Sequence, residues 1–217
     1  MKTKNVVVFD IDDTLLYEYE YLMSAFKEIS YKICSNIQDA ETLYNKMLNI
    51  YNKKEDVFKF LTESYHNLDL KELIQLYRNH LPNYISYKNS IDLLSRLKQL
   101  NCTLGIITDG RSVTQRNKLT QTGMLYFFDD ILISEEFGSE KPNNANYMYY
   151  HKYGEANYFY IGDNLGKDFL APNALNWTTI CLLDNGNNIH KQDFNLDSSF
   201  LPKYKINNLD EVLKFIN

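Results

Sequence analysis

Hydrophobic residues follow two patterns along the chain: short continuous runs, and longer stripes at helical spacing. The runs lie at residues 6–9, 102–107, 131–133, 158–161 and 178–183, and polar residues bound each of them. Short apolar runs rich in β-branched residues are typical of strands that are buried on both faces of a parallel sheet. Helix-like segments separate the later runs, so the pattern predicts an α/β fold with a doubly wound parallel sheet.

The pattern changes between the first run and the second. Four stripes of apolar and aromatic residues recur there at helical spacing, with no strand pattern among them. We expect these stripes to form a small helical bundle whose aromatic residues pack in its interior. The chain then divides into an α/β core, residues 1–16 and 88–217, and an inserted helical domain, residues 17–87.

Capping residues and prolines predict further elements of the core. Ser90 is expected to cap the next helix, and Pro142 suits the first position of another, which places Lys141 at that helix's amino terminus. The polar stretch 184–204 is interpreted as a variable surface loop. Further helices are expected at residues 111–121, from about residue 167, and at residues 209–216.

Composition excludes several classes of protein. The net charge is −5 and no basic run is present, which argues against nucleic-acid binding. No stretch reaches the roughly 20 apolar residues of a membrane span, and Asp10 interrupts the first apolar run too early for a signal peptide. Three widely spaced cysteines are interpreted as thiols in a reducing compartment. These features predict a cytoplasmic protein, either a monomer or a homodimer.

The first apolar run ends in an acidic cluster: Asp10, Asp12 and Asp13. In an extended segment the side chains at i and i+2 share a face, so Asp10 and Asp12 are expected to point the same way. Carboxylates crowded at the end of a buried strand repel each other, which raises at least one pKa. A divalent cation, a nucleophile paired with an acid, or both would explain the cluster; an exposed acidic turn is the alternative.

Two other strands also end in polar residues. Thr108, Asp109 and Gly110 follow the second run, while Asp163 follows the fourth and Asp168 lies five positions later. Ligands bind at the carboxyl ends of the strands in an open parallel sheet, so we expect these residues and Lys141 to converge with Asp10. The neighbouring Arg111, Gln115 and Arg116 are interpreted as a solvated helix face.

Four segments in this order, FDIDDTL, IITDG, SEKP and YIGDNLGKD, resemble the four motifs of the haloacid dehalogenase (HAD) superfamily. The inserted helices are similar to the helical cap of its first subclass. The resemblance implies that Asp10 is a nucleophile that forms an aspartyl-phosphate, with Asp12 as general acid and base. It also implies Mg²⁺ held by Asp10, the backbone carbonyl of Asp12 and Asp163, with help from Asp168.

The same resemblance implies how the phosphoryl group would be bound. Thr108 would contact it, as would the backbone near Asp13, Asp109 and Gly110, and Lys141 would offset the negative charge. This chemistry is self-consistent, because a carboxylate can attack a phosphate dianion only when the local negative charge is neutralised.

We therefore expect a Mg²⁺-dependent phosphatase that acts on a small organic phosphate ester, whose identity the sequence leaves open. A 2-haloacid dehalogenase is an alternative on the same scaffold, although such enzymes need no metal and usually lack an acid at the position of Asp12. A phosphomutase shares all four motifs and is also possible. A phospho-acceptor receiver domain fits poorly, because receivers lack the helical insertion.

Overall fold

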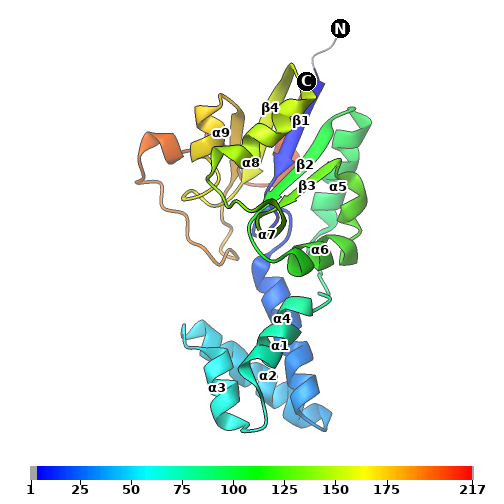
Figure 1. Ribbon diagram of the computed structural model, residues 1–217, viewed down its shortest axis with the longest axis vertical. Coiled ribbons are helices and arrows are strands. Elements are labelled where there is room, and N and C mark those ends of the chain that lie inside the picture. The colour runs from blue at the N-terminus through cyan, green and yellow to red at the C-terminus, as the bar shows by residue number, and fades with distance from the viewer. Residues whose placement is uncertain (1–3, 217) are drawn as a thin grey trace.

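The computed structural model describes residues 4–216 and contains a six-stranded parallel sheet with strand order β3-β2-β1-β4-β5-β6. The α/β fold predicted from the alternating pattern is confirmed. Helices cover both faces of the sheet, and a separate group of helices lies beyond its carboxyl edge (Figure 1). The strands are β1 (Lys4–Phe9), β2 (Thr103–Thr108), β3 (Asp130–Ile133), β4 (Ala156–Gly162), β5 (Thr178–Leu182) and β6 (Tyr204–Ile206).

Strand β1 lies at the centre of the sheet between β2 and β4. Its register places Phe9 beside Ile106 of β2 and Ile161 of β4, so the three strands end at nearly the same level. Val7 and Phe9 pack into the hydrophobic core on one face of the sheet, while Val6 and Val8 pack into the core on the other. Burial on both faces explains the continuous apolar run, and the shared level brings the polar residues that follow these strands together.

The helices of the core pack on opposite faces of this sheet. Leucines of α5 and α6 join the core on one face, and Tyr147 of α8 and Ala171 of α9 join the core on the other. The helices are α5 (Lys88–Gln99), α6 (Ser112–Gln121), α7 (Ser134–Phe137), α8 (Asn144–Met148) and α9 (Leu170–Ala174). Four 3₁₀ segments complete the core: η1 (Met124–Phe127), η2 (Tyr149–Tyr153), η3 (Ser198–Phe200) and η4 (Leu209–Lys214).

The predicted N-cap role of Ser90 and the predicted place of Pro142 at the first position of a helix are both wrong. Ser90 lies inside α5 and is buried. Its hydroxyl does not cap the helix but donates to the backbone carbonyl of Leu15, 2.7 Å away. Pro142 precedes α8, which Asn143 caps by accepting from the amide of Ala145. Lys141 therefore lies on the loop before that helix.

Three other boundaries also differ from the expectation. Helix α9 begins three residues after the predicted position, and the closing segment is the 3₁₀ helix η4. Strand β6 lies at the end of the stretch predicted to be a loop. It has only three residues, of which Ile206 alone is buried, so it carries too little pattern to predict a strand.

Four of the five helices between β1 and β2 form the lower lobe of the molecule in Figure 1. They have a hydrophobic core of their own, centred on Phe26, Met47 and Leu61. Among residues 4–216, no helix has both the length and the apolar character that a membrane crossing needs. The four helices are α1 (Glu18–Ile33), α2 (Ile37–Asn52), α3 (Val57–Ser64) and α4 (Leu70–Asn79).

Candidate active site

A tight turn after β1 carries the first acidic cluster. The amide of Asp10 still donates to Ile161 of β4, and the chain then folds back so that the carbonyl of Ile11 accepts from three following amides. Asp13 has a φ of 53° in this turn, a left-handed conformation that aspartate tolerates better than most residues. The turn leaves Asp10 at the end of the sheet with only 6% of its surface exposed.

Asp10, Asp163, Asp168 and Lys141 form a buried cluster of charges. Carboxylate oxygens of the three aspartates lie within 4.8 Å of one another. The ammonium group of Lys141 lies 2.9 Å from Asp10 Oδ1 and 2.7 Å from Asp168 Oδ1. Burial raises the pKa of Asp10 to about 7 although Lys141 opposes the shift, and burial with the charge of Asp168 raises the pKa of Asp163 to about 9. These acids therefore ionise at a cost that a cation would remove.

Asp168 organises the turn that follows β4. Its Oδ2 accepts from the amides of Asp163 and Asn164, at 3.1 and 2.9 Å, and its Oδ1 accepts from the hydroxyl of Tyr160. A Cβ atom at Gly162 would lie only 2.3 Å from Asp168 Oδ2, so the carboxylate reaches these amides because residue 162 has no side chain.

The carboxylate of Asp12 points to helix α6. Gln115 Nε2 donates to Asp12 Oδ2 at 2.9 Å and to the hydroxyl of Thr108 at 2.6 Å, and Lys118 forms an ion pair with Asp12 Oδ1. Gln115 and Lys118 are 1% and 3% exposed, so the predicted solvated face is wrong for Gln115, and Lys118 is a site residue that was not predicted. Gln115 and Lys118 are three residues apart and therefore share one side of the helix with the neighbouring Leu119, which is buried. This spacing could have predicted that the side carrying Gln115 and Lys118 faces inward.

Asp109, Gly110 and Asp13 lie at the rim of the site. The carboxylate of Asp109 accepts from the amide of Lys141 and from Lys167 Nζ. The amide of Gly110 donates to the Ser134 hydroxyl at 3.0 Å, and the amide of Asp13 donates to the carbonyl of Leu16. These two amides therefore already have acceptors within the chain.

The stretch predicted to be a variable surface loop reaches this site. The amide of Ile189 donates to Asp13 Oδ2 at 2.8 Å, and Asn188 Nδ2 donates to Asp163 Oδ2 at 3.0 Å. The interpretation of this stretch as mere surface is therefore wrong for residues 188–190. All the predicted site residues except Gly110 and Asp168 line one pocket of about 610 Å³, formed by Asp10, Asp12, Asp13, Glu18, Thr108, Asp109, Lys141, Asp163, Asn164, Lys167 and His190.

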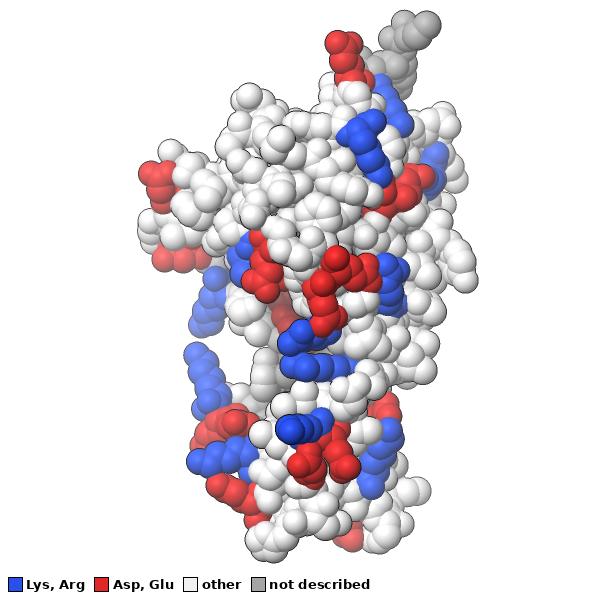
Figure 2. Space-filling model, in the orientation of Figure 1, with Lys and Arg blue, Asp and Glu red and all other residues white. Residues whose placement is uncertain are grey.

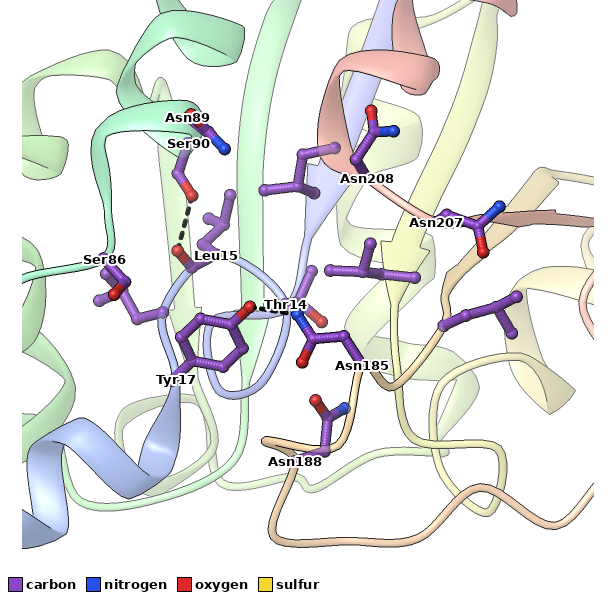
Figure 3. A pocket seen from close by; sticks show the side chains of 14 residues that line it. Thr14, Leu15, Tyr17, Ser86, Asn89, Ser90, Asn185, Asn188, Asn207 and Asn208 are labelled. Carbon is purple, nitrogen blue, oxygen red and sulfur yellow. Dashed lines mark hydrogen bonds between the residues drawn. The ribbon is translucent and has the colours of Figure 1, made fainter.

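A second hollow lies on the other side of the turn after β1 (Figure 3). It measures about 650 Å³, and five of its fourteen lining residues are asparagines. No charged side chain is among these lining residues, so the hollow has no group that could balance a phosphate. The acidic pocket is therefore the candidate active site.

Comparison with known proteins agrees with this geometry. The sequence profile of the haloacid dehalogenase-like hydrolases matches residues 7–182. A glyceraldehyde 3-phosphate phosphatase of Methanocaldococcus jannaschii is 28% identical and is aligned over 97% of this chain and 96% of its own length.

Solved structures show the same fold. A HAD phosphatase of Thermococcus onnurineus superposes with a TM-score of 0.64 at 24% identity, covering 98% of both chains. The HAD-hydrolase YfnB of Bacillus subtilis, in a structure described as bound to magnesium, gives a TM-score of 0.67 at 22% identity and covers both chains completely. The chain belongs to the haloacid dehalogenase-like hydrolase family, and it is an enzyme with phosphatase relatives.

Proposed function

We propose that this enzyme is a Mg²⁺-dependent phosphatase that hydrolyses a small organic phosphate monoester through an aspartyl-phosphate on Asp10. The observation that carries the proposal is one pocket that contains Asp10, Asp12 two residues later, and the buried partners Asp163 and Lys141. A dehalogenase needs neither the second acid nor the acidic metal site.

The donor set of the cluster fits Mg²⁺. Three buried carboxylates surround one ammonium group, so the cluster carries an excess of negative charge once all three are ionised, and all the available ligand atoms are oxygens. We propose that Asp10, Asp163 and the backbone carbonyl of Asp12 hold the ion. Asp168 helps by orienting the amide of Asp163 and the side chain of Lys141. Bound Mg²⁺ supplies positive charge to the transferring phosphoryl group.

The side chains of the chain then have separate tasks. Asp10 attacks phosphorus while Asp12 protonates the leaving alkoxide, and Asp12 next removes a proton from the water that hydrolyses the aspartyl-phosphate. Thr108 contacts the phosphoryl group, and Lys141 offsets its charge. Asp13, Asp109 and Gly110 are still predicted to contact the substrate. To bind the phosphoryl group, the amides of Asp13 and Gly110 would have to release their present acceptors, the Leu16 carbonyl and the Ser134 hydroxyl.

We further propose that residues 17–87 act as a cap on the core formed by residues 1–16 and 88–217. Helix α1 follows directly from the catalytic turn, and Glu18 at its start lines the active-site pocket. Figure 2 shows a waist between the two lobes, bordered by side chains of both charges. A cap in this position can exclude water and select the leaving group.

The first test is metal dependence. Activity on an aryl phosphate should disappear in the presence of a chelator and return with Mg²⁺, because the acidic cluster repels a phosphate dianion when no cation is bound. Full activity in chelator, or release of halide from a 2-haloacid, would instead favour the dehalogenase alternative.

The second test separates the two carboxylates. Asp10→Asn should abolish turnover because an amide is a poor nucleophile. Asp12→Asn should retain part of the attack on an aryl phosphate, whose leaving group needs little protonation, and should slow hydrolysis of the intermediate by roughly 10² to 10⁴-fold. Intact-protein mass measurement after acid quench should then show one added phosphate in Asp12→Asn. Absence of the adduct from every variant would contradict the covalent mechanism, and transfer of the phosphate to a second substrate hydroxyl would indicate a phosphomutase.

A further inference from the structure

Residues 184–192, with the sequence DNGNNIHKQ, form a loop that is stabilised by hydrogen bonds between its own residues. Asp184 Oδ1 accepts from the amides of Gly186 and Asn188, at 2.7 and 3.1 Å. Gln192 closes the loop, because its Oε1 accepts from the amide of Asp184 and its Nε2 donates to the carbonyls of Leu182 and Asp163. Side chains at both ends therefore hold the loop in one conformation.

The same loop forms hydrogen bonds with three residues around the active site, which are Asp13, Asp163 and Tyr17. Asn188 and the amide of Ile189 donate to Asp163 and Asp13, as described above. Asn185 Nδ2 donates to the hydroxyl of Tyr17 at 2.7 Å, a contact that Figure 3 shows next to Asn188. Tyr17 is the residue before helix α1, so the loop bridges the metal-binding end of the sheet and the entry to the cap.

His190 is the residue that this loop presents to the active-site pocket. The other basic side chains around the pocket are engaged: Lys141 with Asp10, Lys167 with Asp109, and Lys118 with Asp12. Within the described part of the chain, the imidazole of His190 has no hydrogen-bond partner. His190 is exposed, and a neutral imidazole offers a ligand one donor and one acceptor nitrogen.

A groove of about 1070 Å³ continues from this point between the loop and the cap. Glu18 and His190 line the acidic pocket, and their chain neighbours Tyr19 and Ile189 line the groove, so the two spaces adjoin on both walls. The cap wall contributes the ring pair of Tyr19 and Tyr51, with centroids 6.1 Å apart. The loop wall contributes the amides of Asn187 and Asn188.

We propose that loop 184–192 is the specificity-determining wall of the active site and that His190 hydrogen-bonds to a hydroxyl of a neutral, ring-shaped leaving group. The substrate class is then a sugar phosphate of five or six carbons; this inference rests on the phosphatase function proposed above.

Three features support that class of substrate. Sugar hydroxyls both donate and accept, which matches imidazole and amide partners. Tyrosine rings offer a flat apolar surface to the carbon face of a sugar. The two lysines that line the pocket, Lys141 and Lys167, are already paired with Asp10 and Asp109, so a carboxylate on the leaving group would find no unpaired lysine in this pocket.

The experiment compares three esters in the presence of Mg²⁺: ribose 5-phosphate or glucose 6-phosphate, 3-phosphoglycerate, and 4-nitrophenyl phosphate. The wild-type enzyme should have a kcat/KM at least about 10-fold higher for the sugar phosphate than for 3-phosphoglycerate. In His190→Ala the ratio of kcat/KM for the sugar phosphate to that for the aryl phosphate should fall about 10-fold, the value of one good hydrogen bond. His190→Gln, which keeps a donor and an acceptor, should recover part of this ratio.

His66→Ala is the matched control, because His66 is exposed on the loop between α3 and α4. Its ratio should equal that of the wild type, and the melting temperature in Mg²⁺ should show that His190→Ala keeps its fold. An equal loss of kcat/KM on all three esters, or no loss on any, would overturn the role of His190. A wild-type preference for 3-phosphoglycerate would overturn the substrate class while leaving the phosphatase proposal intact. Inactivity on every ester would overturn both.

Discussion

Lys141 places an ammonium group between two buried carboxylates, those of Asp10 and Asp168. Although burial disfavours its charged form, these two anions hold the pKa of Lys141 well above its usual value. The lysine is therefore a fixed charge, and its removal leaves two buried acids without a cationic partner.

We predict that Lys141→Met lowers the free energy of unfolding in chelator at about pH 8 by about 3–5 kcal/mol, because it breaks a buried ion pair on one side only. Turnover with Mg²⁺ should also fall roughly 10²-fold or more. Urea unfolding and steady-state kinetics measure the two effects. Lys167→Met is the control, since its exposed pair with Asp109 should contribute no more than about 1 kcal/mol. Equal losses of stability in the two variants would contradict the assignment.

At the scale of an element, the turn after β4 depends on the close approach of the Asp168 carboxylate to the backbone of Gly162. Asp168 folds back to cap the amides of Asp163 and Asn164, and Gly162 leaves the room for it. Asp163, the proposed metal ligand, therefore takes its position from a residue five places later and from the absence of a side chain one place earlier.

We predict that Gly162→Ala displaces Asp168 and lowers the free energy of unfolding by about 1–3 kcal/mol, the usual cost of overpacking. The Mg²⁺ concentration for half-maximal activity should rise as well, because Asp163 loses its orienting partner. Gly166→Ala, four residues further along, is the control: a Cβ there would meet Asn164 Oδ1 at 3.5 Å, an ordinary contact. If the two variants need the same Mg²⁺ concentration, the turn does not position Asp163 as a metal ligand.

At the scale of the whole molecule, the buried acids link stability to pH. The pKa values of Asp10 and Asp163 are raised to about 7 and about 9, mainly by burial, whereas aspartate in an unfolded chain has a pKa near 3.9. Between about pH 4 and the raised pKa of each acid, the folded state therefore binds more protons than the unfolded state. Their contribution to stability is complete below about pH 4 and is lost as the pH rises toward 9.

We therefore predict that stabilisation by Mg²⁺ grows with pH, since the ion binds the carboxylates in their ionised form. The rise in melting temperature on adding Mg²⁺ should be small near pH 5 and larger near pH 8, measured by thermal unfolding against a chelator baseline. Asp163→Asn should remove most of this pH dependence. A rise that is the same at both pH values would contradict a metal site made of these acids.

The sequence by itself determined five of the six strands of the sheet, the four inserted helices and the acidic ends of the strands. Strands buried on both faces must be apolar, so a carboxylate such as Asp10 directly after one of them stands out. The helices of the insertion bury one face each, which produces stripes that can be recognised without any knowledge of their partners.

Only the tertiary structure decided which polar residues face the site. Gln115 and Ile189 look like ordinary surface residues along the chain, yet they contact Asp12 and Asp13, which lie 103 and 176 positions away. Those contacts exist because β1 lies between β2 and β4, with β5 next in order, so the segments that follow these strands meet at one edge of the sheet. A polar residue buried by a distant partner has the same local pattern as one exposed to water, and only the packing distinguishes them.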